Sequence, residues 1–260
     1  MNFVSFRSMR TAHGVNMARH GRTLMRGALQ LAVMANVLGS NPVRDVSPIV
    51  PKSPPKGAPA LSGAELGELL SRIAANDYCL DNDLVDPITI FVATGFRRSE
   101  LLALRWVDYD PKAGTLAVTG KLARIIGEGL QRMDSGKTVP SRRTVALPEF
   151  AITTLKERRR TPFWGEQKMI FPSTAGTWRD PDNFDKQWRK VREDLGVPEV
   201  TSHSFRKSVA DLIDDGGLSA RVGADQLGHA KVSMTQDKYM SRGRTHLEVA
   251  ALLDRAIKNE

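Results

Sequence analysis

The stretch TGFRRSELLALRW, residues 94–106, decides the fold because it joins two apolar segments through a glycine turn. Residues 88–93 before it are mostly apolar, and from Arg98 onward apolar residues recur at helical spacing. The pattern predicts a helix, a turn and a second helix, with Arg97 at the start of the second. A guanidinium at a helix start can bind phosphate. Taken alone, the better interpretation is a surface arginine in an i,i+3 ion pair with Glu100.

Downstream, the pattern changes to short β-like segments and then returns to helix. Residues 116–119, 122–126 and 144–147 are β-like and are separated by a glycine and by a polar stretch, which predicts a small antiparallel sheet. A capping box predicts a helix that begins at Ser62. Helical spacing predicts further helices over residues 149–160, 181–195, 202–214 and 218–227, and a last one that begins at about Thr245. The expected fold class is mainly α with a small antiparallel β-sheet (α+β).

A proline-rich segment sets the N-terminal part of the chain apart. An apolar stripe over residues 24–38 predicts one helix that ends near Gly39. Residues 41–60 contain six of the fourteen prolines, which predicts a stiff, extended linker. The predicted organisation is a helical segment at 1–40, a linker at 41–60 and the main domain at 61–260.

Composition narrows the class of function. Hydrophobic residues make up 41% of the 260 residues and charged residues 26%, which excludes a disordered or fibrous chain. Lys and Arg number 38 against 29 Asp and Glu, and the net charge of +9 favours an anionic partner, nucleic acid more often than a membrane surface. The single cysteine, Cys79, excludes an intramolecular disulfide and fits a reducing compartment.

The turn Ser135-Gly136-Lys137-Thr138 offers a lysine that could donate a proton to a leaving oxygen. Alone, it is better explained as a solvated turn. It is also similar to the end of a phosphate-binding P-loop. Gln131 replaces the upstream glycine of that motif, and the strand-to-helix context is absent, so nucleotide binding is rejected.

Three more pieces follow in the C-terminal third. His203 and Arg206 stand three residues apart on one predicted helix and could contact one phosphate, or could be a capping histidine and an exposed arginine. His229 follows the glycine that ends the next predicted helix, which could equally be a plain helix terminus. Tyr239 lies in a polar stretch and carries little weight alone.

Together, these pieces resemble the tyrosine recombinases, the phage and plasmid integrase family. The resemblance covers the chain from about Leu61 and rests on TGFRRSELLALRW, GKTVPSRRTVALP, HSFRKSVADL and LGHAKVSMTQDKYMSRGR. Each piece is weak, and their order in one basic chain is highly specific. Within the family, the chain most resembles integrases of actinobacterial mobile elements.

The resemblance implies a set of catalytic residues and no metal or other cofactor. Tyr239 matches the nucleophile, and Lys137 matches the hairpin lysine, with Lys121 as the alternative. The remaining matches are Arg97, His203, Arg206 and His229. Lys207 departs from the family, many members of which have a second histidine there, and this position is outside the catalytic set.

The implied activity is site-specific cutting and rejoining of DNA through a covalent 3′-phosphotyrosine, the chemistry of type IB topoisomerases. The expected partners are double-stranded DNA at attachment or core sites and further copies of the chain, as a tetramer on DNA; an excisionase partner stays open. A cytoplasmic, nucleoid-associated protein of bacterial or phage origin is expected. The C-terminal helix docks into a neighbouring subunit or packs on its own core.

The segment ARHGRTLMRGALQLAVMANVLGSNPVRDV, residues 18–46, resembles the last helix of the family's core-binding domain. We therefore expect residues 1–40 to be a remnant of that domain, and recombination by this chain to be poor because a one-sided clamp binds DNA weakly. Two other functions stay open. One is a decayed integrase that only binds DNA, and the other is a phosphodiesterase with two histidines that releases its product to water.

Overall fold

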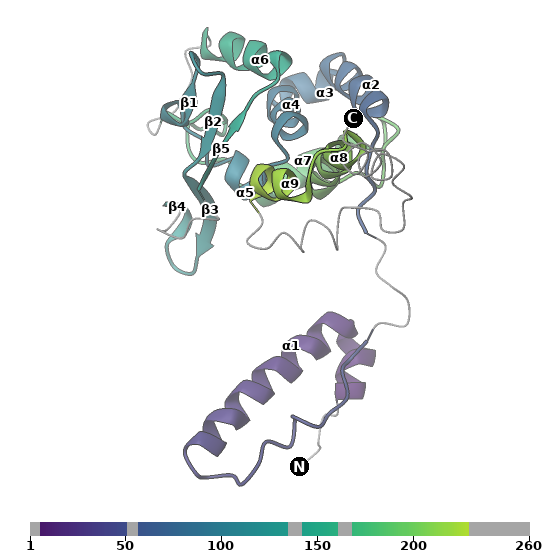
Figure 1. The fold of residues 1–260 in the computed structure, drawn as a ribbon, viewed down its shortest axis with the longest axis vertical. Helices are drawn as coiled ribbons and strands as arrows, with labels where there is room; N and C mark the ends of the chain where they lie inside the picture. The colour runs from purple at the N-terminus through teal and green to yellow at the C-terminus, as the bar shows by residue number, and fades with distance from the viewer. Residues whose placement is uncertain (1–5, 51–56, 135–141, 161–167, 229–260) are drawn as a thin grey trace, which may run out of the picture. The chain divides into compact units, whose positions relative to one another are not determined.

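The structure is a computed structural model that describes residues 6–50, 57–134, 142–160 and 168–228 (Figure 1). It divides the chain into two units, Met1–Gly57 and Ala58–Glu260. Among the described residues, no helix combines the length and the apolar character that a membrane crossing requires.

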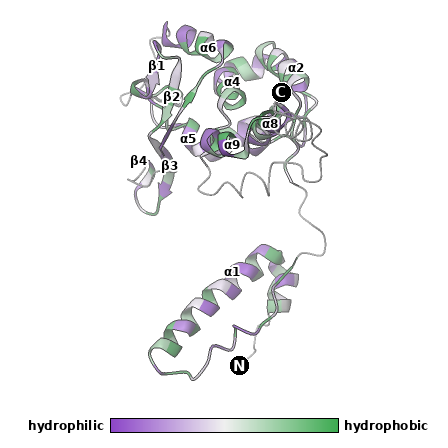
Figure 2. Ribbon diagram, in the orientation of Figure 1, coloured by the Kyte–Doolittle hydropathy of each residue, from purple (hydrophilic) through white to green (hydrophobic). Residues whose placement is uncertain are grey.

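The first unit is built on α1 (Phe6–Met34), which consists of two helical segments joined by a kink at Gly14, where φ is 83° and ψ is 169°. Hydrophilic and hydrophobic residues occur along its length (Figure 2). The helix ends earlier than the predicted Gly39. Asn36 adopts a left-handed φ of 57°, and the N–H of Val37 bonds to the carbonyl of Ala32 at 2.9 Å. This arrangement closes the last turn, so an asparagine ends the helix where the sequence analysis expected a glycine.

The chain after α1 returns along the helix. The side-chain amide of Asn41 donates to the carbonyl of Arg26 at 2.9 Å, and the guanidinium of Arg19 donates to the carbonyl of Ile49 at 2.7 Å. Val43 is buried within this unit. Hydrogen bonds therefore hold the first half of the proline-rich segment to α1.

The second unit contains eight described α-helices and two small antiparallel sheets. The helices are α2 (Gly63–Ala74), α3 (Asp77–Asp81), α4 (Val85–Thr94), α5 (Arg98–Leu101), α6 (Glu149–Arg160), α7 (Pro181–Val191), α8 (Ser202–Asp215) and α9 (Ala220–Leu227), with a 3₁₀ turn at η1 (Trp106–Asp108). The strands are β1 (Tyr109–Asp110), β2 (Thr115–Val118), β3 (Gly120–Ile125), β4 (Gly129–Asp134) and β5 (Arg143–Ala146). The expected α+β class is confirmed.

One sheet has the order β1-β2-β5, and β3 pairs with β4 as a separate hairpin. In the first sheet, Leu116 is opposite Val145, and both are buried. Strand β4 was not predicted, because the sequence analysis assigned the residues after Gly127 to a polar connection. Figure 1 shows the first sheet on one side of the unit and α2 and α3 on the other, with α9 between them in contact with β5.

The predicted helix over residues 98–106 is too long, since α5 ends at Leu101. The backbone then pairs with a distant segment: the N–H of Ile170 donates to the carbonyl of Leu104 at 3.0 Å, and the N–H of Trp106 donates to the carbonyl of Lys168 at 2.9 Å. These bonds hold the chain extended where helical spacing alone suggested a helix.

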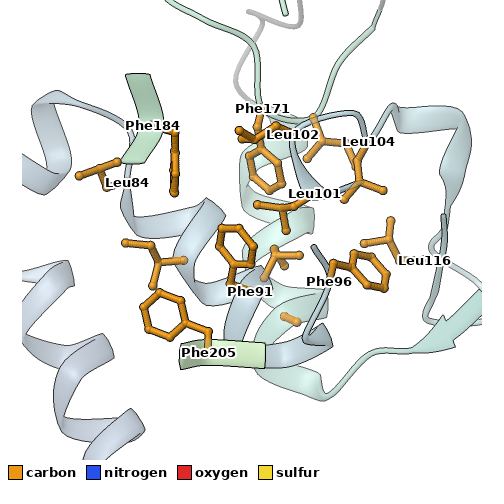
Figure 3. Packing of buried hydrophobic residues seen from close by; sticks show 14 of the residues in the cluster. Leu84, Phe91, Phe96, Leu101, Leu102, Leu104, Leu116, Phe171, Phe184 and Phe205 are labelled. Atoms are coloured by element: carbon orange, nitrogen blue, oxygen red, sulfur yellow. The ribbon is translucent and has the colours of Figure 1, made fainter. Parts of the chain in front are cut away.

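Helix α4 lies at the centre of the core and packs against α2, α5, α6 and α8. The Phe91 ring on this helix lies 6.0 Å from the Phe205 ring and 5.9 Å from the Phe184 ring, measured between centroids (Figure 3). Cys79 of α3 is also fully buried, and desolvation raises the pKa of its thiol to about 11. The core thus fixes α4 and α8 relative to each other, and both lead to the candidate site.

Candidate functional site

The candidate site is built around the C-terminal end of α9. This helix ends at Leu227, and Gly228 caps it with a left-handed φ of 66°. The last carbonyls of a helix have no partner within the helix and lie at the negative end of its dipole. Such an end attracts cations and hydrogen-bond donors, so the end of α9 is a natural place to hold arginines.

Three arginines from separate segments bind three consecutive carbonyls at this end. Arg143 of β5 donates to the carbonyl of Gln226 at 2.9 Å, Arg206 of α8 donates to that of Leu227 at 2.6 Å, and Arg97 donates to that of Gly228 at 3.3 Å. We call these three arginines, together with Glu100, the helix-end cluster. The structure therefore brings together Arg97 and Arg206, which stand 109 residues apart in the sequence.

Arg206 is a buried residue, exposed by only 3%, and its guanidinium joins two helix ends. Besides the carbonyl of Leu227, it binds the carbonyl of Gly95, at 2.8 Å, at the end of α4. Gly95 has a left-handed φ of 65°, and a β-carbon there would lie 2.8 Å from Leu227. The glycine permits the close approach of α4 and α9 that Arg206 bridges.

Arg97 caps the start of α5, and its side chain is 44% exposed. Its guanidinium pairs with Glu100 at 2.8 Å, and its backbone N–H donates to the same carboxylate at 3.0 Å. The i,i+3 ion pair considered from the sequence is thus present. It does not compete with a phosphate-binding role, because it holds a partly exposed guanidinium in place.

Glu100 is the carboxylate of the cluster, and its side chain is nearly buried. Burial on its own would raise its pKa. The hydrogen bond and charge of Arg143, followed by the N–H and charge of Arg97, outweigh burial and hold the pKa below its usual value. Glu100 is therefore ionised at neutral pH and binds two guanidiniums at once.

His203 lies in the first turn of α8 and is exposed, three residues before the buried Arg206. The expected i,i+3 arrangement is present, with the histidine toward solvent. Lys121, the alternative to Lys137, is exposed on β3 opposite Met133. Lys137, His229 and Tyr239 lie outside the described residues.

The sequence analysis missed Arg143 and named Glu100 only as an ion-pair partner. A signal for Arg143 exists in the strand pattern. Side chains alternate across a strand, and Arg143 is on the same face as the buried Val145. An arginine at an inward position needs a buried partner, which points to a carboxylate elsewhere in the chain.

The cluster can bind an anion because its positive charge exceeds its negative charge. Arg97 and Arg143 share the carboxylate of Glu100, and Arg206 donates to the carbonyls of Gly95 and Leu227. A groove of about 500 Å³ lies beside it, lined by residues that include Arg142, Thr144 and Gly228. Within the same described ranges, no group of three His, Cys, Asp or Glu residues is arranged to hold a metal ion.

Comparisons with known proteins agree on one family. Residues 61–245 match the phage integrase family. A "Tyrosine recombinase XerC-like" protein of Caldanaerobacter subterraneus is 29% identical over 56% of this chain and 42% of its own length. The putative prophage phiRv2 integrase of Mycobacterium tuberculosis is 26% identical over 94% of this chain and 63% of its own length. The chain thus spans about half the length of these relatives.

Solved structures show the same fold. The Tn1549 transposon integrase, in complex with a circular intermediate DNA, has a TM-score of 0.79 at 18% identity and covers 98% of this chain and 86% of its own. A lambda integrase dimer bound to a COC′ core site has a TM-score of 0.63 at 17% identity and covers 93% and 64%. The resemblance found in the sequence is confirmed. This chain belongs to the phage integrase family.

Proposed function

We propose that this chain is a site-specific tyrosine recombinase that cuts and rejoins DNA strands through a covalent 3′-phosphotyrosine at Tyr239. The observation that carries the proposal is the charge of the helix-end cluster. Arg97 and Arg206 are held at neighbouring carbonyls, and Arg97 shares the carboxylate of Glu100 with Arg143. The excess positive charge suits a phosphodiester, whose negative charge spreads over its non-bridging oxygens as the nucleophile attacks.

In the proposed cleavage step, the phenol oxygen of Tyr239 attacks the phosphorus and the bond to the 5′ oxygen breaks. His203 accepts the phenol proton, and Lys137 gives a proton to the departing 5′ oxygen. Arg97 and Arg206 stabilise the pentacoordinate phosphorus, and His229 donates a hydrogen bond to one of its oxygens. The products are a 3′-phosphotyrosine and a free 5′ hydroxyl.

Rejoining is the reverse step. The 5′ hydroxyl of the exchanged strand gives its proton to Lys137 and attacks the phosphotyrosine, and the phenol of Tyr239 leaves with a proton from His203. The covalent intermediate conserves the energy of the phosphodiester bond, so the exchange consumes no ATP. This chemistry is that of type IB topoisomerases.

The proposed biological role is the integration or excision of a mobile element of bacterial or phage origin. Relatives named as prophage and phage integrases support this role. We assign catalysis to residues 61–260 and part of a core-binding domain to residues 1–40, joined by the segment 41–60. Four copies assembled on two attachment sites would supply the sites for exchange, with an excisionase as a candidate accessory protein.

The test is covalent capture on DNA of unspecified sequence. The protein is incubated with a library of nicked duplexes of randomised sequence, in which the cleaved strand diffuses away and traps the adduct. We expect an adduct that survives denaturation and is absent with Tyr239→Phe. Sequencing the trapped strands then yields the preferred site.

Three outcomes would overturn the proposal. Equal adduct levels in wild type and Tyr239→Phe would remove the tyrosine from the reaction. Selective binding without any adduct would identify a DNA-binding protein that has lost catalysis. Cleavage that releases both strand ends to water, without an adduct, would instead indicate a phosphodiesterase that uses His203 and His229.

A further inference from the structure

Arg143 makes three separate contacts within the helix-end cluster. Its Nε donates to the carbonyl of Gln226 at 2.9 Å, and one of its Nη atoms lies 2.8 Å from Glu100. Its guanidinium also lies over the ring of Phe96, 4.9 Å from the centroid. One planar group thus connects β5, the end of α9 and the turn before Arg97.

The guanidinium of Arg143 is enclosed: its side chain is only 7% exposed. The second Nη is buried and has no hydrogen-bond partner among the residues that the structure describes. A β-carbon on Gly228 would lie 2.5 Å from this nitrogen. Arg143 also lines the groove beside the cluster, but its guanidinium is already engaged by Gln226, Glu100 and the Phe96 ring, so we expect its effect on the reaction to pass through these neighbours.

The neighbour that matters is Glu100. Its carboxylate holds Arg97 with one oxygen and Arg143 with the other, at 2.8 Å in both cases. Arg97 is half-exposed and has a long, flexible side chain, so it depends on this carboxylate for its direction. Arg143 binds the other oxygen of this carboxylate and is itself anchored at the carbonyl of Gln226, so the direction of the carboxylate depends on Arg143.

We propose that Arg143 is a positioning residue of the recombination reaction: it orients Glu100, and through Glu100 it aims the Arg97 guanidinium at the scissile phosphate. This inference rests on the proposed function. The chemistry of the guanidinium explains why residue 143 is an arginine. A lysine could not donate to Glu100 and Gln226 at once in a fixed plane, and an apolar residue would leave Glu100 buried with one partner fewer.

The experiment uses the full chain and a nicked duplex selected from the randomised library by the wild type. Arg143→Gln is expected to lower the single-turnover cleavage rate at saturating DNA by about 10- to 100-fold, because small misplacements of a catalytic group cost rates of that order. The DNA dissociation constant should stay close to that of the wild type. The matched control is Arg189→Gln, which removes the same charge from an exposed position on α7, outside the helix-end cluster and its groove, and should leave the rate unchanged.

A pH profile separates positioning from a general loss of structure. Among the described residues, the charged groups that face Glu100 are Arg97 from the α5 cap and Arg143 from β5. Without Arg143, burial should raise the pKa of Glu100, and its protonation would release Arg97. The Arg143→Gln rate should therefore fall more steeply than the wild-type rate as the pH is lowered, beyond the decline that protonation of His203 causes in both proteins. Adding Glu100→Gln should abolish this additional decline.

If Arg143→Gln fails to fold, Glu100→Gln alone and Arg143→Lys keep the inference testable, since both should slow cleavage without weakening DNA binding. A wild-type rate for Arg143→Gln would overturn the inference and leave the proposed function intact. A loss of cleavage rate in Arg143→Gln that is the same at every pH would also overturn it. So would a double variant whose loss of rate equals the product of the losses in Arg143→Gln and Glu100→Gln, because two residues that act through one contact should not have independent effects. Absence of any adduct with the wild type would overturn the function itself, and the inference with it.

Discussion

Two groups of arginines in the second unit differ in how their charge is balanced. Away from the helix-end cluster, Arg158 of α6 binds both oxygens of Asp83 at 2.7 Å and also binds Asp86 at 2.8 Å. Arg179 donates to the carbonyl of Asp83 at 2.8 Å. These two arginines and two aspartates form what we call the balanced network, in which each guanidinium is matched by one carboxylate.

The difference separates stability from function. In the balanced network, the opposite charges neutralise each other, and an added anion would gain nothing. The helix-end cluster has three guanidiniums for one carboxylate, and the dipole of α9 offsets only part of the remainder. Two buried arginines in a protein therefore do not indicate an anion site, whereas an excess of guanidiniums over carboxylates does.

The largest expected effect is on catalysis in the helix-end cluster. Arg97→Ala should lower the single-turnover cleavage rate by about 100- to 1000-fold, since it removes one donor to the transition state. Rapid-quench assays on the selected nicked duplex measure this rate. Arg72→Ala is the matched control, because Arg72 is similarly exposed, at 47%, and pairs with Glu68 on its own helix. Equal losses of cleavage rate in Arg97→Ala and Arg72→Ala would show that the helix-end cluster has no special part in catalysis.

The next effect is on stability in the balanced network. Arg158→Met should lower the free energy of unfolding by about 3 kcal/mol, because it leaves Asp86 without its arginine and Asp83 with only Arg179, at 3.5 Å. Urea denaturation measures the loss, and the cleavage rate per folded molecule should not change. Arg159→Met, at the exposed neighbouring position, should cost less than about 1 kcal/mol. A selective loss of cleavage in Arg158→Met would contradict the structural assignment.

A smaller effect is expected at the glycine that caps α9. Gly228→Ala should destabilise the fold by about 1–2 kcal/mol, because the left-handed φ of 66° and the proximity of Arg143 both oppose a β-carbon. Gly67→Ala, within α2 and with open space around it, should instead stabilise the protein by about 0.5–1 kcal/mol. Thermal melts compare the two variants, and shifts of the same sign would be inconsistent with this account.

The smallest expected effect is on the pH dependence of stability at Glu100. The folded-state pKa of Glu100 lies below its ordinary value of 4.5. Its contribution to stability is therefore complete above that pH and is lost as the pH falls through the folded pKa. The difference in unfolding free energy between wild type and Glu100→Gln should shrink from about pH 6 to about pH 3. A difference that stays constant over this range would show that Glu100 does not gain from its arginines.

Local signals predicted much of the fold. The capping box at Ser62 predicted the start of α2, and helical spacing predicted a helix at residues 149–160, which is where α6 lies. Strand β4 was missed because its side chains show no alternation of buried and exposed positions. The hairpin that it forms with β3 is held by backbone pairing, which leaves no hydrophobic pattern to detect.

The candidate site was predictable only in part. Arg97 and Arg206 were identified from short motifs, and the structure brings them to one helix end. The contacts that hold them there involve main-chain carbonyls, such as that of Leu227, and these carry no residue-specific signal. Arg143 was overlooked because its partner, Glu100, lies 43 residues away and on another element.

The buried state of Cys79 has a practical consequence for measuring assembly. Its thiol is enclosed in the core, and with a pKa of about 11 it forms almost no thiolate at neutral pH, so maleimide dyes will not attach to it. Ile126, at the tip of the β3–β4 hairpin, is fully exposed. Ile126→Cys therefore provides a single labelling position without removal of the native cysteine, and a donor–acceptor pair placed there would report when two copies meet on DNA.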